Sequence, residues 1–266
     1  MDGFQVVGRK NKIRRRVNKT VQNCDSQSVE DFDIEKCKEK INSYRLELLH
    51  SDFSKKFFNV LQRTISITEE HSSIEEIVVY GIGSISSSIT AKYQLALVLL
   101  IIEKLQIKCY AYDPILVQKE MDLLQSFNIN VINKNEECKR LACVATMFFM
   151  LHCGKAMYNN LLWRNWSKQH LEKVYIIGND FSSYEERLPE RVFLETGKYI
   201  KQVLPYTLKN KIENCFVHDD IFNDTALHTF PKNLLLQVPE KLWSENSEPI
   251  PIPDDVEIIR NTKILQ

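Results

Sequence analysis

The chain has 266 residues, of which 44% are hydrophobic and 26% charged, so it can bury a core and is neither a disordered chain nor a disulfide-rich mini-protein. Lys+Arg and Asp+Glu both total 35, and a chain without net charge is not built to wrap DNA or to lie on an acidic membrane. The longest apolar run, residues 95–105, is too short to span a bilayer, and the first residues lack the apolar segment of a signal peptide. We therefore expect a soluble intracellular protein without membrane contact.

The cysteines indicate reduced thiols. There are seven of them, an odd number, and no Cys-x-x-Cys pair occurs, which fits the cytosol or nucleus better than a disulfide framework. Cys138 and Cys143 have no second pair or nearby histidine that would complete a zinc site. No metal site is expected.

Residues 1–28 are predicted to form a disordered basic arm. The first 24 residues carry seven Lys and Arg against Asp2 alone, a local net charge of 7 − 1 = +6, and lack apolar periodicity. Such a run is typical of a nuclear-import or nucleic-acid patch and equally of a solvated tail. Contact with nucleic acid is expected only through this arm.

The rest of the chain predicts a layered α/β domain. Apolar residues at three-to-four spacing predict two helices within residues 29–72 that pack on the core. Strands are then predicted at residues 77–80, 108–112, 129–132, 144–151, 174–177, 214–218 and 234–238. Helices are predicted at residues 87–105, 116–127 and 155–166, followed by one helix that reaches 204 and is ended by Pro205.

This alternation is typical of a doubly wound, mainly parallel (Rossmann-like) sheet over residues 73–245, because parallel strands need crossover connections and are covered on both faces. The order of the last two strands favours a methyltransferase-like variant with an antiparallel strand at one edge. Residues 246–266, with three prolines, are expected to form an extended tail.

In such sheets ligands bind beyond the carboxyl ends of the strands. The first strand is followed by Gly81, Gly83 and Ser84, whose turn and free N–H groups favour a phosphate or carboxylate at the next helix. Ser86 stands where the dinucleotide fingerprint has a third glycine, so the segment also fits a plain turn with a serine cap. Asp113, after the second strand, can bind sugar hydroxyls or cap a helix that begins at Pro114.

The later strand ends carry groups that titrate. His152 can act as an acid or base, and Cys153, beside Lys155 at a helix N-terminus, is either a nucleophile or a buried packing residue. Asp224 and His228 can form an acid–base or metal pair, or belong to Asx turns. The ligand-binding hypothesis comprises Gly81, Gly83, Ser84, Asp113, His152, Lys155, Asn179, Ser182, Asp224 and His228. The candidate catalytic groups are His152, Cys153 and His228.

Several of these segments together resemble a known family. They are Val79-Tyr80-Gly81-Ile82-Gly83-Ser84, Tyr112-Asp113-Pro114, the block from His152-Cys153 through Tyr158-Asn159-Asn160-Leu161-Leu162-Trp163, Ile177-Gly178-Asn179-Asp180-Phe181-Ser182-Ser183-Tyr184 and Phe222-Asn223-Asp224-Thr225. In this order, over about residues 74–231, they resemble the SRR family (Sensitivity to Red Light Reduced), and in particular its animal SRR-like members.

The resemblance implies a regulator in circadian-clock input and clock-gene expression, with a role in haem biosynthesis in animals, protein partners, and a location in cytoplasm and nucleus. It implies no catalytic reaction. Leu151 stands where the family usually has proline, and no Cys-Pro dipeptide of haem-regulatory motifs occurs, so a direct haem ligand is not implied. Three hypotheses stay open: a regulatory interaction protein, an enzyme that uses a nucleotide or S-adenosylmethionine-like ligand, and a small-molecule sensor.

Overall fold

The computed structural model describes residues 32–68 and 73–250. The predicted arm at residues 1–28 lies outside the described residues, as does most of the predicted tail at residues 246–266.

A seven-stranded sheet forms the centre of the described chain, with the strand order β3-β2-β1-β4-β5-β7-β6. The strands are β1 (Glu76–Tyr80), β2 (Lys108–Tyr112), β3 (Ile129–Val131), β4 (Thr146–Met150), β5 (Val174–Asn179), β6 (Leu208–Lys211) and β7 (Thr225–Thr229). The pairs among β1 to β5 are parallel, whereas β7 runs antiparallel to both β5 and β6. The predicted fold class, including the antiparallel strand near one edge, is confirmed.

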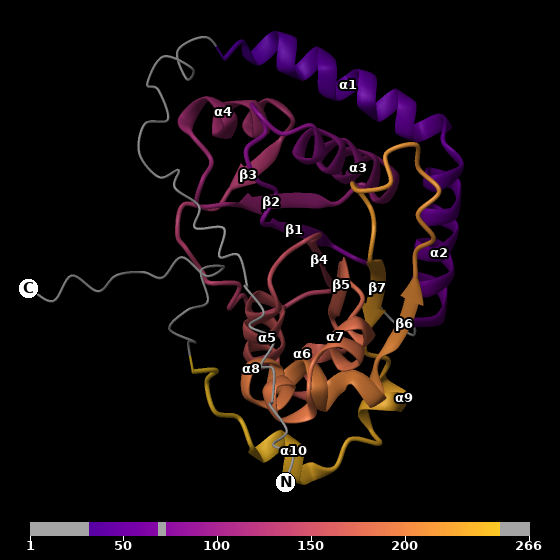
Figure 1. Cartoon of the computed structure of the whole chain (residues 1–266), viewed down its shortest axis with the longest axis vertical. Helices are drawn as coiled ribbons and strands as arrows, with labels where there is room; N and C mark the ends of the chain where they lie inside the picture. Colours follow the sequence, from indigo (N-terminus) through magenta and orange to yellow (C-terminus); the bar gives the residue numbers. More distant parts are fainter. Residues whose placement is uncertain (1–31, 69–72, 251–266) are drawn as a thin grey trace, which may run out of the picture. The chain divides into compact units, whose positions relative to one another are not determined.

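Helices cover both faces of this sheet (Figure 1). They are α1 (Ile34–His50), α2 (Asp52–Thr68), α3 (Ile89–Leu105), α4 (Gln118–Ser126), α5 (Lys155–Arg164), α6 (Lys168–Leu171), α7 (Ser182–Arg187), α8 (Glu190–Val203), α9 (Lys232–Leu235) and α10 (Glu240–Ser244). Strand order reverses between β1 and β4, so right-handed crossovers place α3 and α4 on one face and α5 and α8 on the other. None of the described helices combines the length and the apolarity needed to cross a membrane.

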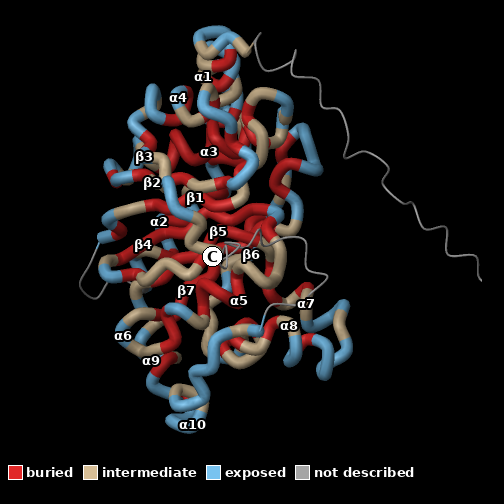
Figure 2. The backbone as a smooth tube through the Cα atoms, turned by 90° about the vertical axis from the view of Figure 1, so that its left-hand side faces the viewer, coloured by how far each residue is buried: buried red, intermediate tan, exposed pale blue. Residues whose placement is uncertain are grey.

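The core lies on both sides of the sheet, and Figure 2 shows the central strands as largely buried. All five residues of β4 and of β7 are buried. Helix α3 is apolar on most sides because it is enclosed: the sheet lies beneath it and α1 packs over it. On the opposite face Tyr158 of α5 and Tyr199 of α8 are fully buried beside Phe148 of β4.

The prediction of a strand at residues 214–218 is wrong. This segment is a loop in which the Asn214 side chain accepts the N–H of Phe216 (3.1 Å) and donates to the carbonyl of Asp219 (2.7 Å). The Phe216 ring packs against Phe53 and Phe222 at centroid distances of 6.1 and 5.6 Å. The strand at the edge of the sheet, next to β7, is instead β6. Its sequence Leu-Lys-Asn-Lys is mostly polar, so it does not form the apolar run by which strands are predicted.

The strand predicted at residues 234–238 is also wrong, because α9 begins directly after Pro231 and buries only Leu235. The last strand is β7, whose sequence Thr-Ala-Leu-His-Thr falls where the sequence predicts no strand. The single helix predicted up to residue 204 is two helices, α7 and α8. They are separated at Leu188, which is extended because Pro189 follows it.

Candidate ligand-binding site

The loop after β1 makes the tight turn that its glycines predict. Gly81 and Gly83 have φ angles of +68° and +79°, a region that side chains of other residues rarely occupy. A Cβ on Gly81 would lie 2.6 Å from Sγ of Cys153, so this loop also packs closely on the end of β4. Beside Gly83 there is open space, because no atom lies within 4 Å of the position of a Cβ.

Asp113 at the end of β2 is bound to this loop. Its Oδ2 accepts the N–H of Gly83 (2.8 Å), its Oδ1 accepts the N–H of Ile115 (3.0 Å), and only 8% of the residue is exposed. No helix begins at Pro114, because α4 starts at Gln118, so the helix-cap interpretation of Asp113 is wrong. Each carboxylate oxygen has two lone pairs, and Asp113 therefore keeps acceptor capacity for hydroxyl groups.

Glu120 is the residue of the site that the sequence interpretation missed. It is 1% exposed, and its Oε1 accepts from Ser84 Oγ (2.9 Å) and from the N–H of Ser86 (2.7 Å). Its Oε2 accepts the N–H of Val117 at 3.1 Å. Burial acts to raise the pKa of Glu120, but the hydrogen bonds from Ser86, Val117 and Ser84 outweigh it and hold the pKa below its ordinary value. A glutamate three residues after the N-cap residue, here Val117, is the available signal, since that spacing is typical of a capping box.

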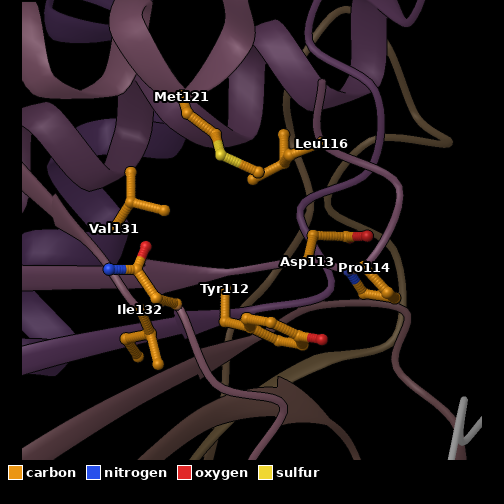
Figure 3. Close-up of a pocket in the computed structure, with 8 residues that line it drawn as sticks. Tyr112, Asp113, Pro114, Leu116, Met121, Val131 and Ile132 are labelled. Carbon is orange, nitrogen blue, oxygen red and sulfur yellow. The ribbon is translucent and has the colours of Figure 1, made fainter. Parts of the chain in front are cut away.

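A cavity of about 230 Å³ opens at the carboxyl ends of β2 and β3. It is lined by Tyr112, Asp113, Pro114, Leu116, Met121, Val131, Ile132 and Asn133. Figure 3 shows Met121 and Leu116 on one side and Tyr112 on the other, with Val131 and Ile132 at one end and Asp113 at the opposite end. Six of the eight lining residues are apolar or aromatic, and Asp113 and Asn133 add a carboxylate and an amide. Of the ten predicted ligand-binding residues, Asp113 lines it.

A second group of predicted residues gathers around Asn179 at the end of β5. The Asn179 side chain accepts the N–H of His152 (2.9 Å) and donates to the carbonyl of Cys153 (3.0 Å). His152 has a φ of +56°, and its Nε2 lies 2.9 Å from the carbonyl of Ile221. A carbonyl only accepts, so Nε2 carries the proton. The thiol of Cys153 is buried and donates to the carbonyl of Tyr80 at 3.4 Å.

His228 is fully buried on β7. Its Nε2 lies 3.0 Å from the carbonyl of Asn179, its ring stacks on Phe181 at 4.0 Å, and its Nδ1 has no hydrogen-bond partner within the described chain. Burial lowers the pKa of His228 to about 4, so the ring is neutral at physiological pH.

The remaining predicted residues have other partners. Asp224 lies 3.9 Å from Arg187 and accepts from Ser183 at 3.4 Å. It cannot pair with His228, because four residues along a strand span about 13 Å. Lys155 donates to Thr196, and Ser182 accepts from Lys209 (2.8 Å), which also binds Asp180 (3.0 Å). Nine of the ten residues therefore lie at or just beyond the carboxyl ends of the parallel strands, whereas His228 pairs with Ile176 within the sheet, and the ten form separate clusters.

No described residues offer a group of three or more His, Cys, Asp or Glu side chains that could hold a metal ion. The strand order defines an α/β protein of the doubly wound class, and a cavity opens at the carboxyl ends of β2 and β3.

Comparison with known proteins identifies the family of the chain. The profile of the SRR1 domain matches residues 37–229, and the chain belongs to this family, as the sequence motifs indicated. It is 47% identical to an SRR1-like protein of Mus musculus over 130 residues, which are 47% of this chain and 52% of the mouse protein. It thus spans about half the length of that relative. No solved structure matches the chain.

Two more distant relatives extend the comparison. An SRR1-like protein of Drosophila melanogaster is 26% identical over 268 residues, which cover 98% of this chain and 94% of the fly protein. Protein SENSITIVITY TO RED LIGHT REDUCED 1 of Arabidopsis thaliana is 30% identical over 172 residues, 62% of each chain.

Proposed function

We propose that this chain is a regulatory protein whose α/β domain binds a nucleoside-containing small molecule in the cavity at the ends of β2 and β3. The observation that carries the proposal is the combination, in this cavity, of a mostly apolar or aromatic lining with the carboxylate of Asp113. It opens at the carboxyl ends of the parallel strands, the side of a doubly wound sheet on which ligands bind, and β1 separates it from the reversal of strand order between β1 and β4.

The dimensions and chemistry of the cavity favour a nucleoside. Pockets for drug-sized molecules measure about 300–1,000 Å³, so a cavity of about 230 Å³ suits a smaller group such as a purine base. Leu116, Met121 and Val131 supply apolar contacts for the faces of a base, and Tyr112 supplies an aromatic ring. Asp113 is placed to accept hydrogen bonds from the ribose hydroxyls, the role that an acid after the second strand has in ribose-binding folds.

The biological part of the proposal rests on the family. We propose that the chain acts in circadian-clock input and clock-gene expression, that it influences haem biosynthesis, and that it works through protein partners in cytoplasm and nucleus. Membership of the SRR1 family supports a regulatory role, and the Arabidopsis relative is named for sensitivity to red light. Ligand binding would regulate by favouring one shape of a partner surface, which needs a difference in affinity between two states and no chemical step.

A second candidate is an enzyme that acts on the same class of ligand. The observation that favours it is His152, an exposed histidine held with a left-handed backbone at the end of β4. Residues in such conformations cluster at functional sites. Cys153 and His228 support this candidate less, because the thiol is buried and hydrogen-bonded and the ring of His228 is enclosed.

Isothermal titration calorimetry of the full chain with adenosine tests the binding proposal. Val131→Phe fills the cavity, and we expect it to abolish binding while the melting temperature is retained. Val217→Phe makes the same chemical change at a loop position that is 75% exposed, so adenosine binding should persist. If neither adenosine nor an adenosine derivative binds the wild-type chain, the binding proposal is wrong.

The regulatory proposal is tested in cells that lack this protein, by following clock-gene transcripts and haem content after re-expression. Wild-type and Val217→Phe chains should restore both, and Val131→Phe should not. His152→Gln separates the two candidates, because glutamine can still donate to the carbonyl of Ile221 but cannot transfer a proton near neutral pH. A folded His152→Gln chain that binds ligand yet restores nothing would favour the enzyme.

A further inference from the structure

In the loop after β1, hydrogen-bond donors that could bind a phosphate are already bonded to other residues of the chain. In folds that bind dinucleotides, N–H groups of this loop and of the following helix face the phosphates. Here the N–H of Gly83 donates to Asp113 (2.8 Å), and Ser84 Oγ and the N–H of Ser86 donate to Glu120 (2.9 and 2.7 Å). Two carboxylates of the chain itself therefore occupy the place of an anionic ligand.

Donors at the N-terminus of the following helix, α3, are also hydrogen-bonded within the chain. Ser88 is the N-cap of α3, and its hydroxyl accepts the N–H of Ala91 at 3.1 Å. The hydroxyls of Ser84 and Ser87 are hydrogen-bonded to each other at 2.9 Å. The N-terminus of α3 thus has fewer free hydrogen-bond donors for a phosphate than the dinucleotide-like spacing of Gly81 and Gly83 predicts.

The charges beside the loop disfavour a second anion. Glu120 is 1% exposed and is held by donors on both of its oxygens, so its carboxylate cannot turn away from the loop. Asp113 adds another carboxylate on the side of the cavity. Lys92 contacts this loop through its Nζ, which donates to the carbonyl of Ser86 at 2.9 Å. Like charges brought together in a partly buried site repel strongly.

From these contacts we infer that the ligand is a nucleoside whose 5′ substituent is neutral or cationic, as in the S-adenosyl sulfonium class, and not a nucleoside polyphosphate or a dinucleotide. The inference rests on the proposed function, because it assumes that the cavity at β2 and β3 holds the base. The ribose then lies at Asp113, and its 5′ carbon points toward the open space beside Gly83. Carboxylates at that place attract a sulfonium and repel a phosphate.

Calorimetric titration of the full wild-type chain tests this inference. The probes are S-adenosylmethionine, 5′-methylthioadenosine, ATP and NAD. We expect the first two to bind at least about tenfold more tightly than ATP and NAD, since like-charge juxtaposition disfavours the phosphates. If ATP or NAD binds as tightly as 5′-methylthioadenosine or more tightly, the inference is wrong although the nucleoside proposal stands. If none of the probes binds, the nucleoside proposal fails and the inference fails with it.

Glu120→Gln tests the cause of the discrimination. The amide oxygen of glutamine can still accept from Ser84 and Ser86, while the negative charge is lost. We expect the affinity ratio between 5′-methylthioadenosine and ATP to fall toward one. Asp122→Asn removes a charge from an exposed position of the same helix and should leave the ratio unchanged. An unchanged ratio in folded Glu120→Gln would overturn the role of Glu120, and the wild-type ratio tests the inference even if this variant does not fold.

Discussion

The carboxylate of Asp113 accepts the backbone N–H of Gly83, with 2.8 Å between Oδ2 and the nitrogen, and so joins the end of β2 to the loop after β1. Its other oxygen accepts the N–H of Ile115 at 3.0 Å. One side chain that lines the cavity therefore sets the conformation of two loops.

Asp113→Asn should lower both the stability of the folded chain and its affinity for the ligand. An amide has a single acceptor oxygen, so one of the two N–H groups would face an NH₂ donor. We expect a loss of about 1–3 kcal/mol in the free energy of unfolding, the cost of leaving a buried donor unpaired, together with a lower affinity for adenosine. Urea denaturation and calorimetry measure the two effects. Asp122→Asn is the control, and an Asp113→Asn chain with wild-type stability and affinity would contradict the assignment.

Gly81→Ala should cost more stability than Gly83→Ala. Both place a non-glycine residue at positive φ, which costs about 1–2 kcal/mol. Only the Cβ at position 81 meets an atom, Sγ of Cys153 at 2.6 Å, and relief of that overlap should cost about 1–3 kcal/mol more. The extra cost should shrink in a Cys153→Ala background, as a double-mutant cycle of melting temperatures can show. Strict additivity of the two substitutions would mean that the loop avoids the thiol by another route.

Stability should fall in acid partly through Glu120. Its pKa in the folded chain lies below its value in the unfolded chain, so its contribution is present above pH 4.5 and is lost as the pH falls through the folded-state pKa. Glu120→Gln has no such charge to lose. The difference in the free energy of unfolding between wild type and Glu120→Gln should therefore be larger at pH 7 than at pH 3.5, measured by urea denaturation at each pH. A difference independent of pH would contradict the ionised, hydrogen-bonded carboxylate.

His228 gives a second and separate pH dependence. Its folded-state pKa of about 4 lies below the ordinary value of 6.5, so the unfolded chain binds the proton first as the pH falls. The free energy of unfolding should drop between pH 6.5 and 4, by up to about 3 kcal/mol if no other group opposes it. His228→Gln keeps a donor for the carbonyl of Asn179 and removes the titration. Its stability curve should be flatter over this interval, and an equally steep curve would show that another group is responsible.

Much of the fold was predictable because it depends on local patterns. The apolar runs of β1, β4 and β5 are buried on both faces, and the helices between the strands carry their own periodicity and caps. The loop at Gly81 and Gly83 was found because tight turns with positive φ need glycine. The position of Asp113 followed from the rule that strand ends converge at one edge of a parallel sheet.

The tertiary structure decided which partners these residues have. The sequence does not predict β6, because this edge strand is mostly polar. It does not predict β7 either, because Thr and His interrupt its apolar residues although all five residues are buried. Ser86 and Glu120 are 34 positions apart in the chain, and only the packing of α4 beside the loop brings the carboxylate to that N–H. Residue types and local spacing therefore determined that a tight glycine turn follows β1. Only the tertiary structure determined that donors of this loop bind the carboxylates of Asp113 and Glu120. The reason is that the partner of a buried donor depends on which element packs beside it.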